Sequence, residues 1–249
     1  MILQPFNSVF WVLMAGMVAL ISGLWLLVRR RDEKMKTCIL IGLCVLNLLI
    51  FIAYKILLSM DKNYWALTGV ESFNWFSELP LHLCNINMFL IPLGILTRSN
   101  AIKGFSFYAA PLGALMAMIF PDAAFRGYAV TEPRILGFYV THMLIFVCGI
   151  SLLTFGFYRP AVKDLPRVAV TVFVIALAMH GVNALLRSTV CPEVNYFFTF
   201  GADISILNLF WSWIPIPFLY LLPAVVIMAL YMAIFTVPFA IVDRRKKTK

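Results

Sequence analysis

The sequence predicts an all-α membrane protein, a bundle of seven transmembrane helices that forms one integral membrane domain over residues 1–249. Hydrophobic residues make up 63% of the chain and charged residues 12%, whereas soluble domains have about 45–50% and about 25%. The mean hydropathy of +0.94 agrees with this balance, which excludes a soluble globular domain. Seven apolar stretches of about 20 residues follow one another, and each is long enough to cross a bilayer as a helix.

Polar residues and prolines mark the ends of the expected spans. Arg29–Arg31 end the first span, and Pro80 opens the third, where the missing N–H of proline costs nothing. The expected spans are residues 8–28, 37–58, 79–97, 102–120, 134–157, 168–187 and 217–241. The segment 188–216 is amphipathic and rich in aromatic residues and prolines, so we expect it to lie at the outer interface or to re-enter the bundle, shielded by protein.

The basic residues predict the orientation of the chain. Fifteen of the twenty Lys and Arg residues fall in four segments that follow odd-numbered spans: Arg29, Arg30, Arg31, Lys34, Lys36, Arg98, Lys103, Arg159, Lys163, Arg167, Arg244, Arg245, Lys246, Lys247 and Lys249. Cytoplasmic loops carry such an excess, which predicts that the N-terminus lies outside and the C-terminus in the cytoplasm. The same distribution explains the net charge of +9 without nucleic acid as a partner.

Polar residues inside spans gather in the outer half of the expected membrane. They are His82, Cys84, Asn85 and Asn87 on the third span, His142 on the fifth, and His180 and Asn183 on the sixth, with Asp122, Asn195, Tyr196 and Asp203 in the outer connections. Helix rise places Cys84 about 8 Å and His142 about 12 Å below the outer ends of their spans. Such residues are costly in a bilayer and mark functional sites, so we expect a site here.

Cys84 is the candidate nucleophile of this site. A thiol becomes reactive when a base or a cation favours its thiolate. On a helix, His82 and Cys84 point about 200° apart, so the base has to come from another helix, with His142 and His180 as the candidates. The alternative is a buried thiol beside histidines that only connect helices. Cys38, Cys44 and Cys148 lie among apolar residues and are expected to be small core residues.

Other functions remain open from the residues alone. His82, His142 and His180 with Cys84 or Asp122 could bind zinc, but no spacing makes a metal site specific, and we assign none. The polar cluster could also be the outward-facing pocket of a binding or transport protein, or part of a structural factor without chemistry. A proton or sodium pump is disfavoured because no acidic residue lies in the middle of a span. Gly16, Gly42, Gly113 and Gly149 are expected to allow close helix packing.

Several short motifs carry a resemblance to a known family. They are Leu79-Pro80-Leu81-His82-Leu83-Cys84-Asn85, Phe120-Pro121-Asp122, Thr141-His142, Val182-Asn183, Val194-Asn195-Tyr196-Phe197-Phe198 and Trp211-Ser212-Trp213-Ile214-Pro215. In them the chain resembles the YwaF-type bacterial integral membrane proteins, which have seven predicted helices and whose eukaryotic relatives are the transmembrane-protein-164 acyltransferases. The motifs cover residues 79–217, and the first two spans match by hydropathy. One departure is the run Arg187–Glu193, where the family leads us to expect a small, glycine-containing turn.

The resemblance implies a cysteine-dependent phospholipid acyltransferase in the plasma membrane of a bacterium. It implies that Cys84 is the nucleophile and His142 its partner, that phospholipids or lysophospholipids are the substrates, and that no cofactor is needed. The residues expected to support this centre are His82, Asn85, Asn87, Asp122, His180, Asn183, Asn195 and Tyr196. Among them, the side-chain amides of Asn87, Asn183 and Asn195 are the candidate oxyanion donors. Hydrolysis instead of transfer remains open, as does the oligomeric state.

Overall fold

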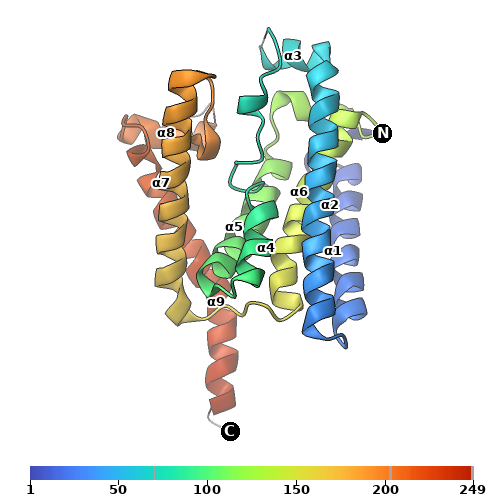
Figure 1. Ribbon diagram of the computed structural model, residues 1–249, viewed down its shortest axis with the longest axis vertical. Coiled ribbons are helices and arrows are strands. Elements are labelled where there is room, and N and C mark those ends of the chain that lie inside the picture. The colour runs from blue at the N-terminus through green and yellow to red at the C-terminus, as the bar shows by residue number, and fades with distance from the viewer. Residues whose placement is uncertain (70, 202–203, 248–249) are drawn as a thin grey trace.

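A computed structural model describes residues 1–69, 71–201 and 204–247 and is built almost wholly of helices (Figure 1). The α-helices are α1 (Ser8–Val28), α2 (Glu33–Met60), α3 (Lys62–Thr68), α4 (Asn87–Leu96), α5 (Asn100–Ile119), α6 (Pro133–Thr154), α7 (Leu165–Thr189), α8 (Ser205–Trp213) and α9 (Leu222–Lys247). Short 3-10 turns are η1 (Trp75–Ser77), η2 (Ala123–Phe125), η3 (Val162–Asp164), η4 (Tyr196–Phe198) and η5 (Leu219–Leu221). The strands β1 (Ile2–Leu3) and β2 (Tyr128–Ala129) pair antiparallel.

Local signals in the sequence fix where the helices begin. Side chains at the position before the helix accept hydrogen bonds from free backbone N–H groups: Asn7 from Phe10, and Asp32 from Met35. Pro133 occupies the first position of α6. α1 has the bounds expected for the first span, and α2, α5, α6, α7 and α9 overlap the other expected spans except the third.

Within the described residues, six helical stretches are long and apolar enough to cross a membrane, which shows a multi-pass membrane protein. They are Ser8–Val28, Glu33–Met60, Asn100–Ile119, Pro133–Thr154, Val162–Thr189 and Leu219–Arg245. The expected seventh, residues 79–97, is helical only over the ten residues of α4, about 15 Å long and too short to span a bilayer. Residues 79–86 form bends and turns instead.

The prediction of a continuous third span was therefore wrong, and its neighbours explain why. Helix hydrogen bonds are replaced here by side chains from distant segments, such as the Tyr196 hydroxyl that accepts from the Leu79 N–H at 3.1 Å. Irregular backbone is tolerated at membrane depth only where protein covers it. The expectation that His82 and Cys84 point about 200° apart on a helix therefore does not apply, because neither residue lies in α4. The segment 188–216 contains η4 and the nine-residue helix α8.

α6 lies at the centre of the bundle, and α5 and α2 pack on it. Most of α6 is buried, whereas α7 and α9 expose most of their surfaces. Glycines allow the closest approaches: a Cβ on Gly137 of α6 would lie 2.4 Å from the Tyr54 Cβ of α2, and one on Gly149 would lie 2.7 Å from Pro111 of α5. The expectation for Gly16 and Gly42 was wrong, because both face open space.

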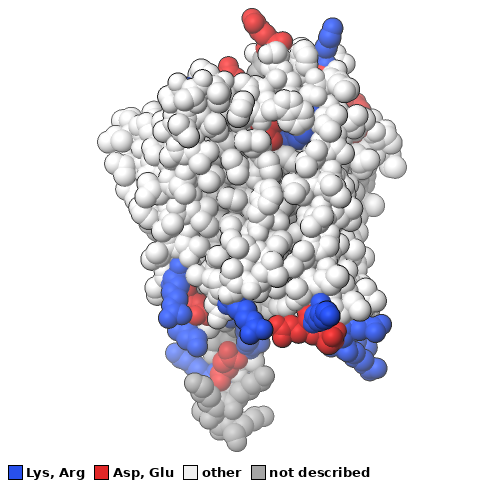
Figure 2. Space-filling model, in the orientation of Figure 1, with Lys and Arg blue, Asp and Glu red and all other residues white. Residues whose placement is uncertain are grey.

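The two ends of the bundle differ in charge. The N-terminus and α3 lie at one end and the C-terminus at the other (Figure 1). Figure 2 shows Lys and Arg gathered at the C-terminal end, together with some acidic residues, beneath a mainly uncharged middle region. The bands of charge are those expected at two membrane surfaces. That the C-terminal end faces the cytoplasm stays a prediction.

The α2–α6 contact gives a test of the fold. Gly137→Ala should lower the free energy of unfolding by about 1–3 kcal/mol, because the added methyl group overlaps Tyr54. Gly42→Ala is the matched control on α2, where nothing lies within 4 Å, and should leave stability unchanged or slightly raised. Thermal unfolding in detergent compares the two. Equal midpoints would contradict the packing described here.

Candidate active site

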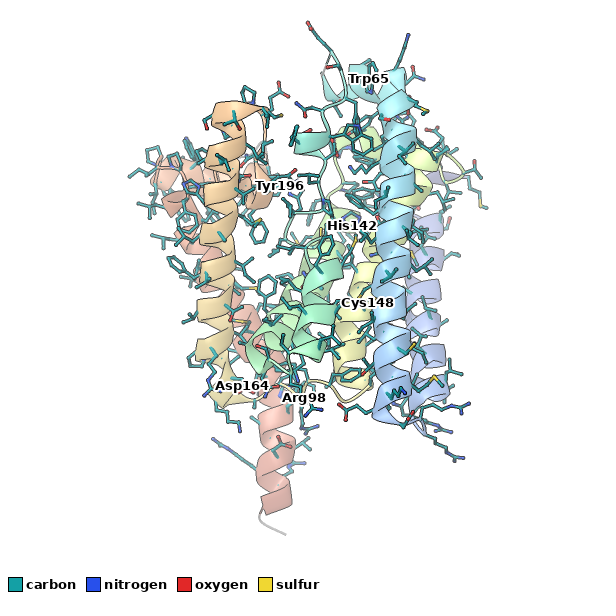
Figure 3. All side chains as sticks on the ribbon, in the orientation of Figure 1. Trp65, Arg98, His142, Cys148, Asp164 and Tyr196 are labelled. Atoms are coloured by element: carbon teal, nitrogen blue, oxygen red, sulfur yellow. The ribbon has the colours of Figure 1, made fainter. Side chains whose placement is uncertain are left out.

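Cys84 and His142 lie against each other inside the bundle. The Cys84 Sγ is 3.5 Å from the His142 Nε2, and the two residues are 8% and 6% exposed. Cys84 belongs to the turn that leads into α4, and His142 belongs to the middle of α6. Figure 3 shows His142 in the interior, nearer than Cys148 to the end of the bundle that carries Trp65 of α3. Of the two histidines that could serve as a base for Cys84, the structure therefore brings His142 into contact.

A backbone hydrogen bond orients the imidazole of His142. Its Nδ1 lies 2.7 Å from the Phe138 carbonyl oxygen. A carbonyl can only accept, so Nδ1 carries the proton and donates it, which leaves the lone pair of Nε2 facing the Cys84 thiol. The Phe138 ring packs against the imidazole at 4.4 Å between centroids and stacks on Phe125 at 4.5 Å. This is the tautomer that a general base for Cys84 requires.

Cys84 also stands where backbone N–H groups are free, just before α4. The first hydrogen bond of this helical turn runs from the Ile86 N–H to the His82 carbonyl at 3.0 Å. Within the described residues, the N–H groups of Cys84 and Asn85 donate to no backbone carbonyl. Free N–H groups at a helix start favour negative charge. Anionic sulfur or oxygen would be stabilised at this position.

Asn85, Asn87 and Gly113 shape the surroundings of the thiol. The Asn85 Oδ1 lies 3.6 Å from the Cys84 sulfur. Asn87 donates its side-chain N–H groups to the carbonyls of Leu83 and Cys84, at 2.7 and 3.3 Å, and so holds the turn from below. A Cβ on Gly113 of α5 would lie 3.2 Å from the Cys84 Cβ, so the glycine lets the turn rest on α5. Asn87 is thus occupied as a scaffold.

His82 faces away from the thiol, toward η4. Its ring packs against Tyr196 and Phe198, with centroids 5.2 and 5.5 Å apart. Tyr196 also accepts a hydrogen bond from the Leu79 N–H and donates one to the Phe76 carbonyl. In Figure 3, Tyr196 lies on the α7 side of the molecule, across from His142. Tyr196 and His82 therefore join the Cys84 segment to the loop after α7.

Asn183 and His180 form a separate polar group on α7. Asn183 donates to the Tyr196 carbonyl at 2.7 Å and to the Thr199 hydroxyl at 2.8 Å, and it accepts from the Tyr196 N–H at 2.8 Å. The His180 Nδ1 lies 3.1 Å from the Thr199 hydroxyl, and its ring stacks on Phe200. These residues fix the loop after α7.

Asn195 and Asp122 cap local turns. The Asn195 side chain donates to the Gly201 carbonyl and accepts from the Phe200 N–H, and Asp122 accepts from the Ala124 N–H at 2.9 Å. Asn87 and Asn183 each donate two side-chain hydrogen bonds to other acceptors, and Asn195 donates one, so their role as oxyanion donors stays a prediction. Asp203 lies outside the described residues. No group of three or more His, Cys, Asp or Glu side chains in the described chain could hold a metal ion.

The comparison with protein families gives one match. The model of the TMEM164 family matches residues 4–236, nearly the whole length of the chain. The chain belongs to the TMEM164 family. The match confirms the resemblance to the transmembrane-protein-164 proteins and extends it beyond residues 79–217 to the first two spans and most of α9. No curated protein and no solved structure matches the chain.

In this TMEM164 family member, three polar residues near the Cys84–His142 pair had escaped the sequence analysis. Lys55 of α2 forms an ion pair with Glu78, which directly precedes the Cys84 segment. Asn47 of α2 donates to the Thr141 carbonyl at 3.2 Å, next to His142. Lys55 and Asn47 both lie within the expected span 37–58. The principle that polar residues inside membrane spans mark functional sites therefore applies to them as it does to the histidines.

Asn183 provides a test of the scaffold around the site. Asn183→Ala should cost about 1–3 kcal/mol of stability, because it leaves the N–H and carbonyl of Tyr196 unpaired in a buried position. Asn208→Ala on α8 is the control, since Asn208 is exposed. Thermal unfolding measures both variants. A stable Asn183→Ala protein would show that the loop after α7 does not depend on this side chain.

Proposed function

We propose that this chain is a membrane-embedded lipid acyltransferase or acyl hydrolase in which Cys84 is the nucleophile and His142 the general base. One observation carries the proposal: the thiol faces an imidazole nitrogen at 3.5 Å whose partner nitrogen is fixed on the Phe138 carbonyl. A nucleophile, a base and a group that orients the base are the parts that covalent acyl transfer needs.

In the first half-reaction the His142 Nε2 takes the proton of the Cys84 thiol. The thiolate attacks the carbonyl carbon of a phospholipid ester, so that a C–S bond forms and the carbonyl oxygen becomes an oxyanion. The N–H groups of Cys84 and Asn85, which donate to no backbone carbonyl in the described residues, are free to stabilise this charge. The ester C–O bond then breaks, and the departing oxygen takes the proton from His142. The products are a thioester on Cys84 and a lysophospholipid.

The second half-reaction returns the enzyme to its starting state. The hydroxyl group of a lysolipid, or a water molecule, gives its proton to the His142 Nε2 and attacks the thioester carbonyl. A C–O bond forms and the C–S bond breaks, and the sulfur regains the proton from His142. Low exposure of Cys84 and His142 keeps bulk water from the thioester, which favours transfer over hydrolysis. The chemistry uses only groups of the chain and its lipid substrates.

The proposed topology places this site near the outer surface of the cell membrane. The N-terminal end of the bundle, which carries α3 and is poor in basic residues, would face outward, and the basic C-terminal end would face the cytoplasm. The Cys84–His142 pair would then lie at the level of glycerolipid ester groups, near the edge of the hydrocarbon.

Exchange of single residues tests the proposed chemistry. Purified protein is placed in phosphatidylcholine vesicles with a labelled acyl chain and a lysolipid acceptor. Cys84→Ala should abolish acyl transfer, and His142→Ala should reduce it by about 10²–10⁴-fold through loss of the base. Cys148→Ala is the control. Like Cys84, Cys148 is buried, but it lies on α6 and packs in a different hydrophobic cluster from Cys84. Intact-mass spectrometry should detect the acyl group on Cys84. Full transfer by Cys84→Ala would refute the nucleophile assignment.

Labelling of the two ends tests the proposed orientation. A single cysteine at position 2, in a background without the five native cysteines, should react with a membrane-impermeant maleimide on intact cells. A cysteine at position 246 should react only after the cells are opened. Reaction of the second cysteine on intact cells would place the C-terminus outside.

A further inference from the structure

An ion pair lies at the start of the segment that carries Cys84. The Lys55 ammonium of α2 contacts the Glu78 carboxylate, and their side chains are 9% and 20% exposed. The ammonium also lies 4.8 Å from the Tyr54 ring centroid and 5.4 Å from that of Phe51, which are cation–π distances. Lys55 is thereby held by two kinds of interaction at one place.

A hydroxyl group completes the cluster. The Tyr64 hydroxyl of α3 donates to the other Glu78 oxygen at 3.1 Å. Burial and the Glu78 carboxylate raise the pKa of Tyr64, so its phenol stays protonated and keeps donating. Both oxygens of Glu78 are thus fixed by groups from α2 and α3. The carboxylate has little freedom to move.

The position of Glu78 in the chain connects this cluster to the segment that carries Cys84. Glu78 immediately precedes residues 79–86, the non-helical stretch that carries Cys84. The other polar anchor at this end of the stretch is Tyr196, which holds the Leu79 N–H. A buried ion pair is weak evidence for stability, because desolvation offsets the attraction, whereas its fixed geometry specifies a position. The ion pair therefore locates the start of the Cys84 segment relative to α2.

α2 is in turn fixed to the helix that carries His142. Tyr54, next to Lys55, packs at Gly137 of α6, where a Cβ would overlap its side chain. Asn47 of α2 donates to the carbonyl of Thr141, the residue before His142. Both contacts lie in the part of α6 that directly precedes His142. A series of contacts thus connects Glu78, through Lys55 and α2, to the part of α6 that carries His142.

We infer that Lys55 and Glu78 are positioning residues, which set the distance between the Cys84 sulfur and the His142 imidazole through α2. The inference deepens the proposed function and rests on it. Neither residue touches the reacting atoms in this role. Loss of the ion pair should free the start of the Cys84 segment. The Cys84 sulfur should then move away from the His142 imidazole, so that His142 no longer acts as its base, while the helices stay packed.

A double-mutant cycle on Cys84 reactivity tests the inference. The background carries Ala in place of Cys38, Cys44, Cys148 and Cys191, so that only Cys84 reacts. The rate of alkylation by N-ethylmaleimide in detergent is followed by intact-mass spectrometry for Lys55→Met, His142→Ala and the double variant. Each single change should slow alkylation by about tenfold or more, and the double variant should be no slower than the slower single variant. Lys55→Arg should retain most of the wild-type rate.

Two further variants make the result specific. Arg159→Met breaks the exposed ion pair of Arg159 with Asp243 and should leave alkylation unchanged. Glu78→Gln removes the charge but keeps a hydrogen-bond acceptor for Lys55 and Tyr64, so it should slow alkylation less than Lys55→Met does. It serves in place of Lys55→Met in the cycle if that variant does not fold.

Two outcomes would overturn the inference. If the effects of Lys55→Met and His142→Ala multiply, Lys55 acts on the thiolate by its charge or by another route that does not pass through His142. If Lys55→Met reacts at the wild-type rate, the ion pair does not position Cys84. The proposed function fails separately: a coupled cycle without acyl transfer by the unaltered protein would leave the positioning role intact and remove the acyltransferase.

Discussion

The burial of a non-helical stretch inside an apolar bundle is the constraint on which the site depends. Each backbone group at membrane depth needs a partner, since an unpaired one costs several kcal/mol. Over residues 79–86 some partners come from side chains: Tyr196 accepts from the Leu79 N–H, and Asn87 donates to two carbonyls at the other end. Within the described residues, the N–H groups of Cys84 and Asn85 donate to no backbone carbonyl. The break in the helix thus leaves backbone donors without a backbone acceptor next to the thiol.

The polar residues that the sequence predicted for the outer half divide according to whether their hydrogen-bonding groups are already used. Asn183 holds the backbone of Tyr196, and Tyr196 holds the Leu79 N–H, so a chain of bonds leads from α7 to the Cys84 segment. His180 is engaged with Thr199 and stacked on Phe200. At His142, by contrast, one ring nitrogen is fixed and the other meets the thiol. Whether the polar groups of a residue are already hydrogen-bonded therefore separates His142 from the others, which depth in the membrane could not do.

The sequence predicted the membrane crossings well because hydropathy averages over some 20 residues. The first span was predicted to the residue, from Ser8 to Val28. The break at residues 79–86 could not be predicted, because Pro80 is as compatible with a helix start as with a turn, and the partner Tyr196 lies 117 positions away. Family resemblance favoured His142 as the partner of Cys84, whereas depth and spacing left His180 open. Lys55 was predictable, since a lysine within an apolar span always calls for a partner.

In the proposed acyl transfer, backbone donors suit the anionic intermediate better than the asparagine amides would. A side-chain amide has to be held in place by further contacts, whereas an N–H at the start of a helix is fixed by the helix itself and needs no reorganisation as charge develops. The asparagines then serve in another way: Asn87 supports the turn from below, and Asn183 supports it through Tyr196. The polarity that the segment needs in order to be buried is therefore also what orients its donors. In a medium of low dielectric, donors held in this way act strongly on a nearby charge.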